Sequence, residues 1–305
     1  MGACVIYNPA AGRGLARRLV ERLKRLRDGA FDFRPTAGPG QGCELAERAV
    51  TAGHGTVIAA GGDGTVHEVA NGVIRSGRPD VVFGVWPVGS ANDYAYALGV
   101  DRDWPLRDGG HGRLAERAVD VGRVSGGGRV GYFVNGLGLG FNSAVTLEAQ
   151  SIPRLRGMAL YGLAFVKAVW RHFHSPPLTI ALDGRQEERR TLAFTINLGQ
   201  REGGFLVTPR AELGDGWFDY VHAGPLSRWQ ALTMLPRIAT GTLPDKHPLI
   251  RQGRCREVRV RSDQPLCIHV DGEFFCRPGD AVTEVAVELL PAALRVLARP
   301  DHLPR

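Results

Sequence analysis

The segment GGDGT at residues 61–65 sets one carboxylate among three glycines. An apolar run precedes it and a helical pattern follows, so we expect the segment at the amino end of a helix. Glycine lets the backbone approach a phosphate closely, and a helix N-terminus favours an anion. Asp63 would repel phosphate unless a cation lay between them, which indicates a nucleotide bridged by Mg²⁺. A plain Gly-Asp-Gly turn is the structural alternative.

Two further loops join a predicted strand to a predicted helix, NPAAGRG at 8–14 and PVGSANDYA at 87–95. Arginine and amide side chains can contact phosphate, and a carboxylate can approach a metal ion. In an open parallel sheet such loops gather at the carboxyl edge, where ligands bind. A turn or a helix cap also explains each loop taken alone. The candidate residues of the two loops are Asn8, Gly12, Arg13, Ser90, Asn92 and Asp93.

Alternating strands and helices must position these loops. Over residues 1–120 this alternation predicts an α/β domain with a mostly parallel sheet. Residues 121–305 instead show short runs of alternating polar and apolar residues, which predict a mainly β domain of sandwich type. The expected strands of the first domain are 3–8, 31–34, 55–62 and 81–89, and its helices are 14–29, 42–53, 64–77 and 91–99. The second domain is expected to hold strands within 130–140, 178–184, 190–199, 216–223, 256–262, 265–275 and 281–290, with helices near 155–173 and 227–239.

The formal net charge of +7 over 305 residues favours anionic partners, such as a nucleotide or the anionic face of a membrane. The apolar run at 158–170 is too short to span a bilayer, and no signal peptide is visible. Five cysteines form no CxxC pair, which indicates a reducing, cytoplasmic environment without disulfides or zinc. The chain has no GxxxxGK[ST] motif, which argues against a P-loop protein, and its basic residues lack the interleaved aromatics of a nucleic-acid binder.

Five blocks stand in the order typical of one enzyme family: NPAAGRG, GGDGTVHEVANGV, PVGSANDYA, TPRAELGDGWFDY at 208–220 and VDGE at 270–273. With these blocks the chain resembles the diacylglycerol-kinase-like lipid kinases, which include the bacterial soluble diacylglycerol kinases and the sphingosine kinases. The resemblance covers nearly the whole chain. It implies an α/β domain similar to those of NAD kinase and phosphofructokinase, followed by a β sandwich, with ATP and Mg²⁺ as cofactors.

The resemblance also implies roles for individual residues. Asp63 would orient Mg²⁺·ATP, and Glu273 would accept the proton of the lipid hydroxyl. A structural Mg²⁺ loop is implied at Asp215, with backbone carbonyls near Glu212 and Trp217. Glu273 also has a simpler explanation, because Asp-Gly before it is a favourable hairpin turn. The implied nucleotide-binding residues are Asn8, Gly12, Arg13, Thr36, Gly62, Asp63, Gly64, Thr65, Glu68, Ser90, Asn92 and Asp93.

Several positions depart from the family pattern, including Tyr96 in place of a common Arg and Asn142 in place of a common Asp. These changes leave open altered substrate choice or weak activity, and Asn142 argues against an amine-bearing lipid. Three functions therefore stay open: a kinase of a glycerolipid such as diacylglycerol, an NAD-kinase-like enzyme with a soluble acceptor, and a non-catalytic nucleotide or lipid sensor.

A lipid kinase must contact its substrate at a membrane surface, and two segments could do so. Residues 251–261 are rich in arginine, and residues 152–173 mix large apolar residues with cations. A solvated strand and a core-packing helix are the structural alternatives. We expect peripheral contact with the anionic inner face of the membrane and no nucleic-acid partner, and the sequence leaves a homodimer open.

Overall fold

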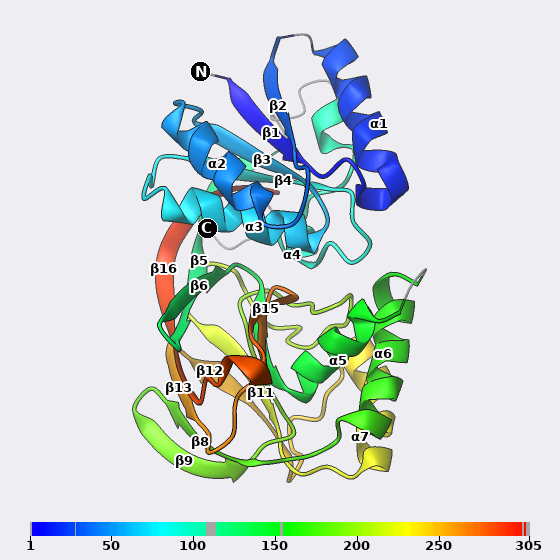
Figure 1. The fold of residues 1–305 in the computed structure, drawn as a ribbon, viewed down its shortest axis with the longest axis vertical. Coiled ribbons are helices and arrows are strands. Elements are labelled where there is room, and N and C mark those ends of the chain that lie inside the picture. The colour runs from blue at the N-terminus through cyan, green and yellow to red at the C-terminus, as the bar shows by residue number, and fades with distance from the viewer. Residues whose placement is uncertain (1, 28, 108–113, 153–154, 301, 303–305) are drawn as a thin grey trace. The chain divides into compact units, whose positions relative to one another are not determined.

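The computed structural model describes residues 2–27, 29–107, 114–152, 155–300 and 302. It divides the chain into two compact units (Figure 1). The first holds residues 1–121, 213–215 and 291–305, and the second holds residues 122–212 and 216–290. The predicted domains, 1–120 and 121–305, would place the last strand wholly in the second domain. In the structure, residues 291–305 group with the first unit.

The first unit is built on a parallel sheet in the order β2-β1-β3-β4, to which the last residues of β16 add beside β4 (Figure 1). All six residues of β4 are buried, as are five of the six in β3, so these strands need apolar side chains on both faces. The strands are β1 (Ala3–Tyr7), β2 (Phe31–Pro35), β3 (Thr56–Gly61), β4 (Val82–Pro87) and β16 (Glu284–Ala298). The helices are α1 (Ala11–Leu26), α2 (Gln41–Thr51), α3 (Asp63–Arg75), α4 (Asp93–Ala97) and the short η1 (Trp104–Leu106).

Antiparallel strands dominate the second unit. One sheet has six strands in the order β12-β11-β10-β7-β14-β15. In the other sheet, the first residues of β16 pair with β13, which pairs with β8, which pairs with β9. The rings of Phe133, in β6, and Phe218, in β11, stack with their centroids 5.6 Å apart. Strand β5 (Ala115–Gly126) begins in the first unit and ends in the second. The other strands are β6 (Arg129–Phe133), β7 (Gly136–Gly140), β8 (Pro177–Leu182), β9 (Arg185–Arg190), β10 (Ala193–Asn197), β11 (Phe218–Ala223), β12 (Ile250–Cys255), β13 (Glu257–Arg261), β14 (Ile268–Val270) and β15 (Glu273–Cys276).

Three helices, α5 (Phe141–Gln150), α6 (Gly157–Arg171) and α7 (Arg228–Thr240), share a separate apolar cluster in the second unit. Phe141 belongs to this cluster, and its ring centroid lies 5.1 Å from that of Phe165 and 5.6 Å from that of Phe173, with both rings nearly perpendicular to it. No helix among the described residues combines the length and the apolar character needed to cross a bilayer.

The predicted fold class is confirmed: an α/β unit with a parallel sheet and a unit of antiparallel β-sandwich type. The predicted strand at 130–140 is in fact two strands, because the backbone amides of residues 134–136 bind the Asp271 carboxylate. The predicted strand at 190–199 corresponds to β10, whereas β9, which precedes it and belongs to the other sheet, was not predicted. Helix α5 was not predicted. Its buried face includes Ser143, Thr146 and Glu148, so the sequence shows no apolar helical period there.

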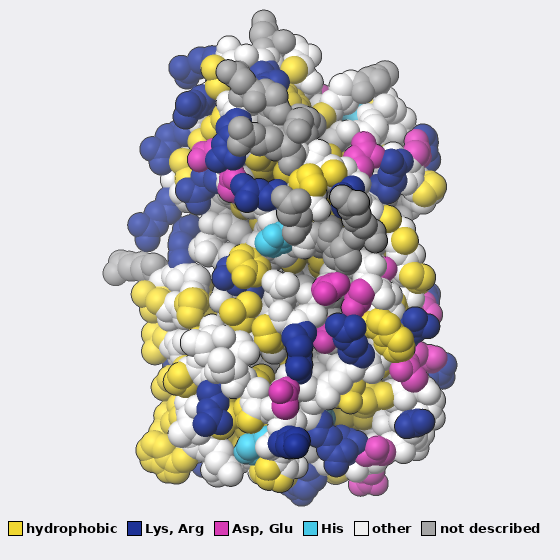
Figure 2. Space-filling model, turned by 180° about the vertical axis from the view of Figure 1, so that it is seen from behind, with side chains coloured by type: hydrophobic (Ala, Val, Ile, Leu, Met, Phe, Trp, Pro, Cys, Tyr) yellow, Lys and Arg dark blue, Asp and Glu magenta, His cyan; other side chains and the backbone are white. Residues whose placement is uncertain are grey.

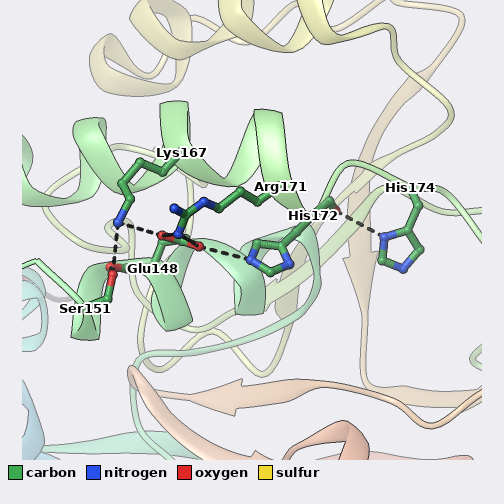
Figure 3. Close-up of polar contacts among 6 residues, drawn as sticks. All are labelled: Glu148, Ser151, Lys167, Arg171, His172 and His174. Atoms are coloured by element: carbon green, nitrogen blue, oxygen red, sulfur yellow. Dashed lines mark hydrogen bonds and ion pairs between the residues drawn. The ribbon is translucent and has the colours of Figure 1, made fainter.

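Glu148 of α5 is a buried carboxylate, with its side chain 6% exposed, and three basic side chains of the α6 region surround it (Figure 3). Its oxygens lie 2.8 Å from Lys167 Nζ, 3.4 Å from an Arg171 guanidinium nitrogen and 3.1 Å from His172 Nε2. Lys167 also donates to Ser151 Oγ at 3.0 Å. The hydrogen bond from Lys167 outweighs desolvation and lowers the pKa of Glu148 to about 2. This cluster therefore fixes α6 on α5.

We expect Glu148→Gln to lower the free energy of unfolding by about 2–3 kcal/mol at neutral pH. Because the folded pKa lies below the ordinary value of 4.5, the carboxylate's contribution is complete above that value. It is lost as the pH falls through about 2. Urea unfolding of both proteins at several pH values measures the difference. Glu44→Gln is the control, since that side chain is 59% exposed. A loss that did not shrink in acid would contradict this role.

Candidate active site

Three strand-to-helix loops of the first unit meet at the carboxyl edge of its parallel sheet. Asn8 N–H, after β1, donates to the Ala60 carbonyl of β3 at 3.1 Å. Val88 N–H and Gly89 N–H, after β4, donate to the Gly61 carbonyl at 2.8 and 3.0 Å. The structure thus brings together the loops 8–14, 61–65 and 87–93, as the strand-and-helix order predicts.

Glycine is required where these loops touch. A Cβ at Gly89 would lie 2.4 Å from Gly62 Cα, closer than atoms can approach. A Cβ at Gly12 would lie 2.8 Å from the Val88 carbonyl oxygen, and Gly12 also has a φ of 60°. Its neighbour Arg13 has a φ of 59°, which is uncommon for a residue with a side chain and marks a constrained loop. The three loops therefore pack backbone against backbone.

Asp63 fastens the second loop to the third. It is the first residue of α3, and its two carboxylate oxygens accept hydrogen bonds from Asn92 N–H at 2.9 Å and Asp93 N–H at 2.7 Å. Asn92 has a left-handed φ of 53°, which turns both amides toward the carboxylate. Asp63 thus has a positioning role that its place in a Gly-Asp-Gly segment did not reveal.

The site fits the phosphates of a nucleotide. The N-cap of α3 is Gly62, which has no side chain to cap the helix, so the backbone amides of the first turn begin at a bare glycine. Asn92 Nδ2 donates to the Gly89 carbonyl at 3.0 Å, whereas Asn92 Oδ1 is buried and has no hydrogen-bond partner among the described residues. A buried acceptor of this kind is satisfied when a ligand, ion or water donates to it.

We expect Gly89→Ala to weaken nucleotide binding by at least about tenfold, because the added methyl group must push the 61–65 loop away. Gly55→Ala is the matched control. Gly55 precedes the opposite end of β3, its φ is not positive, and a Cβ there meets no atom within 4 Å. Fluorescence titration with an ATP analogue measures both variants, and equal affinity for both would refute the loop contact.

Glu68 and Thr36 lie next to these loops. The Glu68 carboxylate accepts from Gly40 N–H at 2.7 Å and Gly42 N–H at 2.8 Å, and so caps the amino end of α2. Thr36 follows β2, and its N–H donates to the Tyr7 carbonyl at 2.9 Å. The remaining predicted side chains differ in access to solvent: Ser90 and Arg13 are exposed, while Thr65 and Asp93 are buried.

Glu273 lies in the second unit, at the start of β15, and its side chain is exposed. Asp271 and Gly272 form a two-residue turn with φ values of 50° and 88°, so the segment is a hairpin turn as well as a candidate catalytic segment. Asp271 accepts hydrogen bonds from three backbone amides, those of Val134, Asn135 and Gly136, at 2.9–3.0 Å. Sequence reasoning missed this residue, which holds the hairpin and therefore the place of Glu273.

Two backbone carbonyls within the implied Mg²⁺ loop, those of Leu213 and Gly216, accept hydrogen bonds from other segments. The Leu213 carbonyl accepts from Asp120 N–H at 2.7 Å, and the Gly216 carbonyl accepts from Arg256 Nε at 3.1 Å. The Arg256 guanidinium lies 4.1 Å from the centre of the Trp217 ring. Within the described part of the chain, one group of three His, Cys, Asp or Glu side chains has ligand atoms close enough together for a single ion. That group is Cys4, Asp32 and His54.

Two families match the chain in succession. Residues 2–124 match the diacylglycerol kinase catalytic domain, and residues 136–298 match the YegS C-terminal NAD kinase beta sandwich-like domain. The diacylglycerol kinases of Bacillus subtilis (strain 168) and Staphylococcus aureus (strain Newman) are each 29% identical to it over 283 residues. These alignments cover 89% of this chain and 89% and 86% of the two relatives.

The fold is shared with solved structures. The crystal structure of a diacylglycerol kinase from Bacillus anthracis str. Sterne superposes with a TM-score of 0.73 at 17% identity. The superposition covers 99% of this chain and 98% of that one.

Proposed function

Because this chain belongs to the diacylglycerol-kinase-like lipid kinases, which use ATP, we propose that it phosphorylates the free hydroxyl of a diacylglycerol. The observation that carries the proposal is the meeting of three glycine-containing loops around the uncapped amino end of α3. Phosphoryl transfer depends mainly on positioning and charge neutralisation, which such a site supplies. The product is phosphatidic acid.

We propose Mg²⁺ as the second cofactor, which when bound to ATP neutralises charge on the phosphates. Asp63 and Asp93 are the acids of the three loops that could orient it, although Asp63 already accepts two backbone amides. Glu273 would accept the proton of the lipid hydroxyl, since an exposed carboxylate can reach a substrate directly. The turn held by Asp271 fixes the backbone from which Glu273 extends.

Asn142 supports a neutral glycerolipid as the acceptor. Its side-chain amide donates to Thr195 Oγ1 and carries no charge, so it offers no counter-ion for the amine of sphingosine. A diacylglycerol has no amine and needs none. We therefore expect the order of activity to be diacylglycerol first and sphingosine last.

A panel of acceptors tests the proposal. The purified chain is incubated with γ-labelled ATP and, in separate reactions, diacylglycerol, phosphatidylglycerol, sphingosine or NAD, and the products are separated by thin-layer chromatography. Labelled phosphatidic acid supports the proposal. Labelled NADP would establish a soluble acceptor instead, and ATP binding without any labelled product would identify a sensor. Omitting Mg²⁺ should abolish the product.

The proposed reaction takes place at the anionic inner face of the membrane, where a protein in the cytoplasm meets both ATP and its lipid. A net charge of +7 favours such a surface. Cell fractionation tests this placement: the protein should be released from membranes by high salt, because its attachment is partly electrostatic.

A further inference from the structure

Helix α6 is apolar on two opposite faces. One face, which includes Ala164, Ala168 and Val169, is buried against the helical cluster of the second unit. Leu163, Val166 and Trp170 stand at helical spacing on another face and are 43%, 36% and 59% exposed. A surface helix normally turns polar residues outward, and a helix that is apolar all round is normally buried. The outer face of α6 is therefore suited to a second apolar environment.

Helix α7 extends this face. Trp229, in its first turn, is 72% exposed, the highest value among the large apolar side chains described. Arg228 ties the two helices together, because its Nε donates to the Val169 carbonyl at 3.1 Å and its guanidinium lies 6.0 Å from the Trp170 ring centre. We call this surface the α6–α7 face. Apolar side chains gather where these helices lie, at the lower left of Figure 2.

The charges of the α6–α7 face are all of one sign. Neither helix contains an Asp or a Glu, and together they carry Lys167, Arg171, Arg228 and Arg237. Glu148 of α5 pairs with Lys167 and Arg171 but is buried, so no acid of this cluster faces outward. Tryptophan beside arginine and lysine is the composition of protein surfaces that lie in the interface of an anionic bilayer.

We infer that the α6–α7 face docks on an anionic lipid bilayer, with Trp170 and Trp229 inserted at the level of the headgroups. The inference rests on the proposed function, for which it names the surface that meets the membrane. The arginine-rich segment 251–261 fits less well. Its apolar Val258 and Val260 face inward, Arg259 pairs with Glu257 at 2.9 Å, and Arg256 covers Trp217.

Sedimentation with lipid vesicles tests the docking without nucleotide or turnover. Vesicles of phosphatidylcholine mixed with phosphatidylglycerol should bind the wild-type chain, and vesicles of phosphatidylcholine alone should bind it at least about tenfold more weakly. The double variant Trp170→Ala, Trp229→Ala should lower the partition coefficient about 100-fold, because it removes two indole rings that would otherwise be buried in the bilayer interface. Arg237→Gln should lower it about fivefold.

Matched variants outside the face serve as controls. Val130→Ala changes an apolar side chain that is 44% exposed on β6, and Arg210→Gln removes an arginine whose side chain is 66% exposed. Both should bind vesicles like the wild type. Circular dichroism shows whether each variant is folded. Trp86, Trp104 and Trp217 also emit, so insertion is measured as a difference between proteins. When vesicles are added, the total tryptophan emission of Trp170→Phe and of Trp229→Phe should each shift to shorter wavelength, and the emission of the double Phe variant should not.

Two results would overturn the inference. One is vesicle binding by the folded double tryptophan variant at the wild-type level. The other is a wild-type dimer in sedimentation velocity that becomes a monomer in this variant, which would make the face an interface between two copies. A water-soluble short-chain diacylglycerol separates docking from catalysis, because its phosphorylation needs no bilayer. Vesicle binding without activity on this substrate would contradict the proposed function alone. Activity on this substrate without vesicle binding would contradict the docking alone.

Discussion

Replacing Glu273 by Gln is expected to lower kcat for diacylglycerol phosphorylation by about 10²–10⁴-fold while changing the Kd for ATP less than twofold. Glutamine keeps the size of the side chain but cannot accept a proton. The residue is exposed at the start of β15, in a different unit from the three nucleotide loops, so its loss should leave ATP binding intact. Steady-state kinetics with labelled ATP and equilibrium binding of an ATP analogue give the two values.

Glu188→Gln is the control for this variant, since Glu188 is an exposed acid on β9 of the same unit. It should retain full activity. Glu273→Asp keeps the carboxylate on a shorter side chain and should recover part of the lost rate. If Glu273→Gln retained wild-type kcat, the residue would be an ordinary hairpin carboxylate and another group would accept the proton.

Replacing Asp63 by Asn should lower kcat/KM for ATP by about 10²–10³-fold and the free energy of unfolding by about 1–3 kcal/mol. The carboxylate accepts the amides of Asn92 and Asp93, and an asparagine offers one acceptor oxygen where two are used. The 87–93 loop then loses its fixed position beside the amino end of α3. Both effects should appear together, because the same two hydrogen bonds underlie them.

Asp80→Asn separates this effect from a general loss of charge. Asp80 precedes β4 at the end away from the loops, and its side chain is 58% exposed and paired with Arg78. It should change neither kinetics nor thermal unfolding appreciably. A folded Asp63→Asn protein with unchanged KM for ATP would show that the carboxylate neither holds the loop nor orients the metal.

The fold class could be predicted from the sequence because each unit has its own pattern. Strands β3 and β4 are continuous apolar runs, as strands covered on both faces must be, whereas β13 alternates Val258 and Val260 with exposed arginines. Helix α5 could not be predicted in this way. Its buried face contains Glu148, whose partners Lys167, Arg171 and His172 belong to a segment that the sequence places in another element.

The meeting of the loops could also be predicted, because glycines after successive parallel strands lie on one edge of the sheet. The partners of the acids could not. Asp63 binds amides 29 and 30 residues away, and Glu68 binds amides 28 and 26 residues away. Asp271 binds amides more than 130 residues away. Such contacts between a side chain and a distant backbone leave no periodic pattern in a sequence.

Membrane contact shows the same limit. The mixture of apolar and basic residues at 152–173 suggested either a docking surface or a core-packing helix. Helix α6 in fact has a buried face and an exposed apolar face, and the sequence could not show which residues the rest of the unit would cover. The structure resolves which side chains remain available to a partner, and Trp229 joins them from a separate helix.

A single-turnover reaction tests the central claim most directly. Enzyme in excess is mixed with γ-labelled ATP, Mg²⁺ and diacylglycerol, and the labelled phosphatidic acid is followed for the wild type, Asp63→Asn and Glu273→Gln. The account predicts rapid product with the wild type, bound ATP but almost no product with Glu273→Gln, and little bound ATP with Asp63→Asn. Equal product from all three proteins would contradict the assignment of these two acids to the active site.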